Sequence, residues 1–358
     1  MSTEVGDVST SAAANTTSGF RSLELRNAQV LRFAFGVTVS TAIAFGLAWP
    51  LHFLTPVLAT FFLSLPLPAP TPGQALKFLG YVLGSTSLGL VFTLFLLPYP
   101  LVYVPALGLI LFHIYYLANR GASPFLVILC LLAVLILPMM SIHHDLLAIL
   151  FGLNFAGSAT LALAFYLIAH AVIPDPVLDR PLPRGTGLQP GYSSTAALNA
   201  LKSTGAILPI ASVFITLELT GEILVMVFAA MVSMAPDVSV GKASGITSLK
   251  ATLIGGAAAI AFYWLIVAVP EFPFFVALML LTMLLFGSGI FSNHPLSSYL
   301  ASAAIALLIL VGGSLGENAD FTEKLFMRVL MISAATLYVM AVLTLIQVFF
   351  DRLRTAPH

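Results

Sequence analysis

A single arginine near the start of the last apolar stretch is the residue best suited to bind a substrate. Arg328 follows Leu325-Phe326-Met327 and precedes a long apolar run, one turn inside the expected outer face of a membrane. A guanidinium at a helix centre in a membrane costs about 2.5–3.5 kcal/mol on insertion scales, so its presence invites a functional reason. It could hold a substrate carboxylate through two parallel hydrogen bonds. The alternative is that Arg328 extends to the outer surface or pairs with Glu323.

Two glutamates four residues apart are candidates for carrying protons. Glu218 and Glu222 lie at the outer end of the seventh apolar stretch, within VFITLELTGE. If the helix continued through both, they would share one helix face. Two neighbouring carboxylates repel each other, so one of them binds a proton more readily, which suits proton transfer. A helix end at Gly221 would instead leave both glutamates in water.

The run His143-His144-Asp145 contains groups that bind metals or protons. Adjacent histidines usually point in different directions, and no Cys or Glu cluster accompanies them, so we expect no metal site. We expect a hydrated outer loop in which Asp145 caps the next helix. The alternative is a part in proton coupling for Asp145, or in proton sensing for one of the histidines, whose unperturbed pKa lies near 6.5.

Three further residues complete the candidate substrate-binding set with Arg328. Asn154, in FGLNFAGSAT, is expected to be buried and to hydrogen-bond to a neighbouring helix. Lys77 and Lys250 begin two similar apolar stretches from the same side of the membrane and could attract anions to the inner mouth. The alternative for both lysines is that they only set the orientation of the chain.

Composition restricts the class of protein. The chain is 59% hydrophobic and 8% charged, with a mean hydropathy of +1.06, whereas soluble domains carry about 25% charged residues. This indicates an integral membrane protein. We find no Ser/His/Asp order, no phosphate-binding loop and no basic patch in the sequence, so we expect no enzyme activity, no cofactor and no nucleic-acid partner. An ion gradient or a partner protein would then have to supply energy.

The elements that must position these residues are apolar stretches, and the pattern predicts twelve of them as membrane-spanning helices. Two, the second of each half, are at or below the practical minimum of about 17 residues. The predicted spans lie near residues 29–48, 51–67, 76–97, 99–117, 123–139, 145–173, 198–219, 221–236, 247–268, 271–290, 296–313 and 321–350.

A polar run rich in proline and glycine divides the chain. We expect a disordered cytoplasmic tail at 1–27, a six-helix repeat at 28–173, a cytoplasmic linker at 174–200, a second six-helix repeat at 201–350 and a cytoplasmic tail at 351–358. With the N-terminus inside, most lysines and arginines fall at cytoplasmic ends, and only Lys324 and Arg328 fall outside. Both termini are therefore expected in the cytoplasm.

Several sequence echoes suggest that the halves are copies. Lys77 and Lys250 open third stretches rich in small residues, and the sixth stretches share SATLALAFYL and SAATLYVMAV. Asp179-Arg180 and Asp351-Arg352 end the two halves at almost the same spacing. Because six spans return the chain to its starting side, the copies would be parallel, related by an axis along the membrane normal.

The chain resembles the fusaric-acid-resistance-like and aromatic-acid-exporter superfamily of inner-membrane proteins, particularly its short branch, a domain of unknown function (DUF2955). The resemblance covers nearly the whole membrane portion, through loose motifs. These are Leu31-Arg32-Phe33-Ala34, the hairpin AFGLAWPLHFLTPVLATFFLSLP at 44–66, the Lys77, Gly80, Gly84 pattern, and the sixth-span echo with its Asp-Arg ending.

The resemblance implies export of small, often aromatic, carboxylic acids and a periplasmic membrane-fusion protein as adaptor. The chain departs from longer members, which place a sizeable cytoplasmic domain between the halves, where this chain has only the linker. The function of that domain therefore does not carry over.

We therefore expect an all-α, polytopic protein of the bacterial inner membrane, in contact with lipid, that exports small organic anions and is driven by protons. Two other classes remain open: a passive organic-anion channel, and a membrane component that assembles other proteins without transporting. The sequence leaves open whether the protein is a homo-oligomer.

Overall fold

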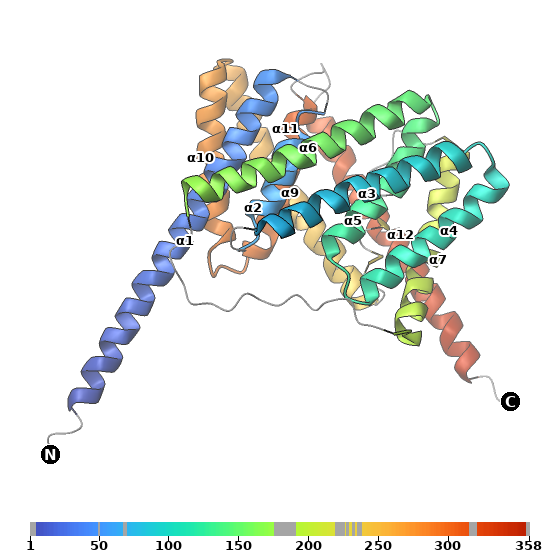
Figure 1. Cartoon of the computed structure of the whole chain (residues 1–358), viewed down its shortest axis with the longest axis horizontal. Helices are drawn as coiled ribbons and strands as arrows, with labels where there is room; N and C mark the ends of the chain where they lie inside the picture. Colours follow the sequence, from blue (N-terminus) through green and yellow to red (C-terminus); the bar gives the residue numbers. More distant parts are fainter. Residues whose placement is uncertain are drawn as a thin grey trace. The chain divides into compact units, whose positions relative to one another are not determined.

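The computed structural model describes residues 5–48, 51–66, 70–174, 191–218, 226, 229–230, 233–234, 238–314 and 321–355. Within these ranges the regular secondary structure is α-helix, with no strand (Figure 1). The all-α class predicted from composition is confirmed for this part of the chain. The helices are α1 (Val5–Leu47), α2 (Leu54–Leu63), α3 (Pro72–Leu96), α4 (Pro100–Asn119), α5 (Pro124–Ser141), α6 (Asp145–Val172), α7 (Ser194–Thr216), α9 (Val238–Ala268), α10 (Phe272–Ile290), α11 (Ser297–Ser314) and α12 (Phe321–Thr355).

These helices coincide with eleven of the predicted apolar stretches. Among the described residues, eight helices are long and apolar enough to cross a membrane, beginning with residues 23–47 of α1. The second stretch forms α2, which has 10 residues and a length of about 15 Å, half of a hydrocarbon core, so its assignment as a span stays a prediction. The predicted eighth span, 221–236, lies mostly outside the described residues, so the total of twelve spans stays a prediction.

The chain forms two compact units, and each takes segments from both halves of the sequence. Unit 1 comprises residues 1–73, 158–181 and 254–316, and unit 2 comprises residues 74–157, 182–253 and 317–358. Unit 1 thus contains α1, α2, α10 and α11 with parts of α6 and α9. Unit 2 contains α3, α4, α5, α7 and α12 with the remaining parts of α6 and α9.

In unit 1, α1 packs antiparallel against α10. A Cβ atom placed on Gly287 would lie 3.1 Å from the ring of Phe33, and one placed on Gly46, near the other end of α1, 3.5 Å from Phe272. The ring centroids of Phe45 and Phe275 are 5.3 Å apart at that same end. The face of α1 between Val30 and Gly46 is therefore covered by α10.

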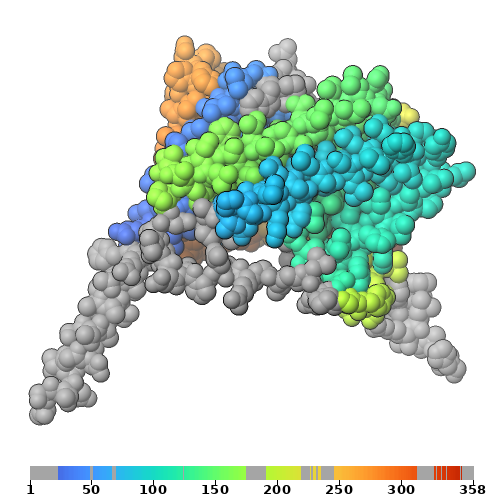
Figure 2. Space-filling view, viewed as in Figure 1, coloured from blue at the N-terminus to red at the C-terminus, as the bar shows by residue number. Residues whose placement is uncertain are grey.

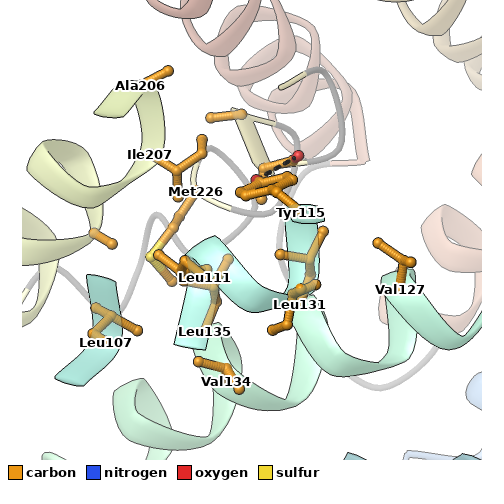
Figure 3. Packing of buried hydrophobic residues seen from close by; sticks show 14 of the residues in the cluster. Leu107, Leu111, Tyr115, Val127, Leu131, Val134, Leu135, Ala206, Ile207 and Met226 are labelled. Carbon is orange, nitrogen blue, oxygen red and sulfur yellow. Dashed lines mark hydrogen bonds between the residues drawn. The ribbon is translucent and has the colours of Figure 1, made fainter. Parts of the chain in front are cut away.

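In unit 2, the hydrophobic core is centred on α4, α5 and α7 (Figure 3). Tyr115 of α4 is fully buried, and its hydroxyl donates a hydrogen bond to the carbonyl oxygen of Ala230 at 3.0 Å. This satisfies a phenol that would otherwise be costly to bury. The core members labelled in the figure are Leu107, Leu111 and Tyr115 of α4, Val127, Leu131, Val134 and Leu135 of α5, Ala206 and Ile207 of α7, and Met226.

Small residues let particular helices approach closely. A Cβ on Gly89 of α3 would lie 2.8 Å from the carbonyl oxygen of Ala133 in α5. Gly152 of α6 lies against Thr86 and Leu90 of α3, where Figure 2 shows the two helices side by side at the surface. Gly84 is different, because a Cβ there would meet no atom within 4 Å.

Candidate functional site

A buried arginine in α1 is the centre of the candidate site. The side chain of Arg32 is only 4% exposed, although it lies within residues 23–47, a candidate membrane span. Its neighbours in sequence, Phe33 and Ala34, are fully buried, whereas Leu31 is half-exposed. The helix therefore turns the guanidinium inward, with the apolar face, and not toward lipid.

The guanidinium of Arg32 binds the C-terminal end of α6. Its Nε donates to the carbonyl oxygen of Ile173 at 2.9 Å, and Nη1 donates to Nε2 of His170, also at 2.9 Å. Carbonyl groups in the last turn of a helix have no partner within the helix and carry partial negative charge. Arg32 thus caps α6 and joins it to α1. The two bonded residues, Arg32 and His170, are 138 positions apart in the sequence.

His170 is a neutral acceptor in this arrangement. The guanidinium has only donors, so Nε2 of His170 must accept, and the proton must be on Nδ1. Nδ1 in turn lies 2.9 Å from the carbonyl oxygen of Tyr166, one helical turn earlier. The His170 ring is thus held from both sides, by Arg32 of α1 and by a carbonyl group of its own helix.

Close helix packing holds the two side chains in place. A Cβ on Gly36, one turn after Arg32, would lie 3.0 Å from Cβ of Ala169, and would also clash with Leu63 of α2. The ring of Tyr166 contacts that of His170 at 4.4 Å and that of Phe62 at 5.9 Å. The site therefore lies between α1, α2 and α6, all inside unit 1.

A second arginine of α1 gives a natural comparison. Nη2 of Arg26 donates to the carbonyl oxygen of Ser288 at 3.2 Å, near the end of α10. Arg26 is exposed, whereas Arg32 is buried. Both arginines cap the C-terminal end of a neighbouring helix, but the Arg32–His170 bond is buried, whereas the Arg26–Ser288 bond is exposed.

All seven residues predicted to bind substrate or protons belong to unit 2. Glu218 is exposed in the turn after α7, and Lys77 and Lys250 are exposed on α3 and α9. Glu222 lies outside the described residues. Arg328 lies in α12, as predicted, but its side chain is not among those described.

Asn154 differs from the expected geometry. It is half-buried, and its amide donates to the carbonyl oxygen of Leu150 in its own helix at 2.8 Å. A helical carbonyl one turn back is always within reach of a short polar side chain, so this bond needs no neighbouring helix.

The loop before α6 has the capping role that we expected, but another residue performs it. The hydroxyl of Ser141 donates to Oδ1 of Asp145, the first residue of α6. The amide of Leu146 in the first turn donates to Nδ1 of His144 at 3.1 Å. Among the described residues, no group of three or more His, Cys, Asp or Glu side chains could hold a metal ion.

A pocket in unit 2 is too small for an organic acid. Its water-accessible volume is about 20 Å³, enough for about one water molecule. It is lined by Thr86, Leu132, Ala133, Ile136, Leu137, Phe151, Gly152 and Phe155, from α3, α5 and α6.

Sequence patterns alone did not single out His170. Arg32 opens the first apolar stretch at a predicted cytoplasmic end, a position typical of a residue that sets the orientation of the chain. A useful signal was present, since His170 interrupts the apolar run LIAHAV near the end of the sixth stretch. This pattern does not indicate that the C-terminal end of α6 lies in contact with Arg32 of α1.

Residues 29–169 match the model of a family described as a protein of unknown function (DUF2955). The match covers about two fifths of the chain and includes Arg32, while His170 directly follows its last residue. Neither the curated proteins nor the solved structures contain a match to this chain. The DUF2955 part of the resemblance is thus supported over the first half of the sequence.

Proposed function

We propose that this protein is an exporter of small organic, often aromatic, carboxylic acids in the bacterial inner membrane, driven by a proton gradient. The observation that carries the proposal is the buried guanidinium of Arg32. An ionisable side chain inside a membrane-spanning segment is costly and usually marks a substrate or ion path. A carboxylate is the natural ligand of a guanidinium, because it can accept two parallel N–H bonds.

The depth of Arg32 suits a role in substrate capture. Its contacts are with the last turn of α6, so it lies near one end of the helices of unit 1 and not at their centre. With the N-terminus in the cytoplasm, this end faces the cytoplasm. An organic anion would then meet Arg32 on entering from the cell interior, in place of one of its neutral acceptors.

His170 lies directly beside the proposed anion site, because its Nε2 is 2.9 Å from Nη1 of Arg32. The proton-driven part of the proposal rests on the sequence, which has no phosphate-binding loop and so leaves an ion gradient or a partner protein as the energy source. The remaining features of the proposal are twelve spans in two parallel repeats with both termini cytoplasmic, and a periplasmic membrane-fusion protein as adaptor. They rest on the sequence pattern and on the resemblance to the exporter superfamily.

A vesicle experiment tests the proposal. The purified protein would be reconstituted in sealed liposomes, and uptake of labelled aromatic and aliphatic carboxylates would be measured with and without an imposed pH gradient. We expect accumulation above equilibrium that is abolished by a protonophore. Equilibration without accumulation would indicate a passive channel, and no flux for any acid, with folding intact, would contradict transport by this chain alone.

Two arginine variants give a matched comparison in the same assay. Arg32→Ala is expected to reduce accumulation at least about tenfold, because the anion loses its charged partner. Arg26→Ala also removes an arginine of α1 that caps a helix end, but it is exposed, so it should retain most of the activity. Equal activity in both variants would show that Arg32 is not the anion contact.

A further inference from the structure

Each compact unit combines a particular set of helices from the two halves of the chain. The helices of the second half are numbered here from α7. On this numbering α7 is the first helix of that half, α10 the fourth, α11 the fifth and α12 the sixth. Unit 1 joins α1, α2 and the end of α6 with α10 and α11. Unit 2 joins α7 and α12 with α4 and α5. In both units, the first helix of one half packs against the fourth helix of the other, and residues of the sixth and fifth helices belong to the same unit.

The first-to-fourth pairing is the same in both units. In unit 1, α1 packs antiparallel against α10, as the contacts at Gly46 and Gly287 show. In unit 2, α4 packs antiparallel against α7. A Cβ on Gly108 would lie 3.0 Å from the side chain of Leu208, and the amide of Ser193, just before α7, donates to the hydroxyl of Tyr116 at 3.2 Å.

The first-to-sixth contact also has a counterpart in each unit, and a glycine of the first helix lies at both. Gly36 of α1 faces Ala169 of α6, with 3.0 Å between the two Cβ positions. Gly205 of α7 faces the Cδ1 atom of Ile346 in α12 at 3.4 Å. Both glycines lie within about one turn of the basic residue in the first helix, Arg32 or Lys202.

A third correspondence joins the third and fifth helices of each half. Gly89 of α3 lies against the backbone of Ala133 in α5, and Gly255 of α9 lies against the backbone of Ala303 in α11. The first contact belongs to unit 2 and the second to unit 1. Small residues allow this approach, which larger side chains would prevent.

The first helix of each half ends in the same unusual way. Ala48 follows α1 with φ = 46°, and its amide donates to the carbonyl oxygen of Phe45 at 3.2 Å. Glu218 follows α7 with φ = 54°, and its amide donates to the carbonyl oxygen of Ile215 at 3.3 Å. This left-handed conformation normally favours glycine and costs a non-glycine residue about 1 kcal/mol or more. Its occurrence after both first helices is difficult to assign to chance.

We propose that the two halves are copies of one six-helix module that exchange helices, so that each half completes its compact unit with the fourth and fifth helices of the other. The face of α10 that receives α1 and the face of α4 that receives α7 are then the same docking surface. Its partner is the first helix of a second copy of the module. Two halves of a single chain occupy both surfaces here, and a half-length chain with these contacts would have to form a two-fold dimer.

The test uses the full chain, with Cys130 replaced by alanine and a protease site placed between Pro181 and Leu182. One cysteine pair, Val30→Cys with Gly287→Cys, probes unit 1, where a Cβ on Gly287 would lie 3.5 Å from Cγ1 of Val30. A second pair, Gly108→Cys with Leu208→Cys, probes unit 2. Each pair joins the two halves, so after oxidation and cleavage the fragments should stay linked on a denaturing gel.

The control pair is Gly84→Cys with Leu208→Cys, since a Cβ on Gly84 would touch no atom within 4 Å. We expect both test pairs to give at least about tenfold more linked product than the control, because disulfides need Cβ atoms about 4 Å apart. The linked fraction should not change on dilution, since the contact lies within one chain.

Self-contained halves would give the opposite result. In that arrangement α1 would pack against α4 of its own half. A third cysteine pair, Val30→Cys with Leu117→Cys, would then form a disulfide on oxidation and lose its free thiols, while both test pairs would remain unlinked. That outcome would overturn the proposal. A link in one unit only would overturn the equivalence of the two docking surfaces. Neither readout uses transport, so the result is independent of the proposed function.

Discussion

The first helices of the two halves, α1 and α7, occupy similar positions in their units but carry different chemistry. In α1, Arg32 is buried and donates to two acceptors at the end of α6. In α7, the corresponding Lys202 is half-buried, and the two residues that follow it, Ser203 and Thr204, are buried. Within the described part of the structure, neither of these hydroxyls has a hydrogen-bond partner. Thr38 of α1 is also a buried hydroxyl without a partner among the described residues, so the two first helices differ in the bonded cation of α1.

This difference indicates where the chemistry is concentrated. A shared backbone arrangement needs only apolar faces and well-placed glycines, which both halves supply. The polar groups are free to differ, and only unit 1 combines a buried cation with a titratable acceptor in the residues described. The proposed function therefore assigns its chemistry to α1 and α6, whereas α4 and α7 contribute to the hydrophobic core of unit 2.

Removal of the charge from each first helix should show the largest contrast. Arg32→Ala leaves the last turn of α6 and His170 without their donor, and hydrogen bonds to charged groups are worth about 1.5–3 kcal/mol each. We expect a loss of about 3 kcal/mol in unfolding free energy, measured by denaturant titration in detergent. Lys202→Ala should change it by less than about 0.5 kcal/mol. Equal losses would mean that the two helices are chemically equivalent.

Alanine substitutions at the two glycines of the first-to-sixth contacts, Gly36 and Gly205, should give the second-largest difference in stability. A methyl group at Gly36 would meet Leu63 and Ala169, so Gly36→Ala is expected to cost about 1–3 kcal/mol through overpacking. Gly205→Ala would meet only the end of Ile346 at 3.4 Å, an ordinary contact, and helix propensity favours alanine by about 1 kcal/mol. We expect Gly205→Ala to be neutral or stabilising. The reverse order in a thermal-unfolding series would contradict the packing described for unit 1.

The acceptor in the α1–α6 contact should have a smaller effect than its donor. His170→Leu removes the ring nitrogen that faces Arg32, and we expect it to lower stability by about 1–2 kcal/mol. His170→Gln keeps a neutral side-chain acceptor and should retain most of the stability. The measurement is the protease resistance of the full chain, and equal losses in both variants would show that the hydrogen bond to Arg32 is not what His170 contributes.

The buried hydroxyls of α7 should give the smallest effect, with the opposite sign. Ser203→Ala removes a buried polar group that has no partner among the described residues, so we expect a gain of about 0.5–1 kcal/mol. Ser40→Ala is the control in α1, where the hydroxyl donates to the carbonyl oxygen of Val37 at 2.8 Å. It should lose stability slightly or not change. A stability loss in Ser203→Ala would indicate that this hydroxyl binds a group that belongs to its working state.

The sequence by itself determined the membrane character and the positions of most helices. Apolar runs of sufficient length leave little choice but helix, because every backbone polar group must be paired away from water. The shortness of α2 and the close approach at Gly89 were likewise readable from run length and residue size. These properties depend on local sequence, so the pattern of residues was enough.

Only the tertiary structure decided which residues meet. Arg32 and His170 are 138 positions apart, and nothing in the run LIAHAV indicates that it ends beside the first helix. The same holds for the pairing of α1 with α10 and of α4 with α7, which joins the two halves. Apolar helix faces are chemically alike, so their sequences do not specify partners. Shape at glycines such as Gly36 and Gly287, and the need to satisfy one buried guanidinium, select among them.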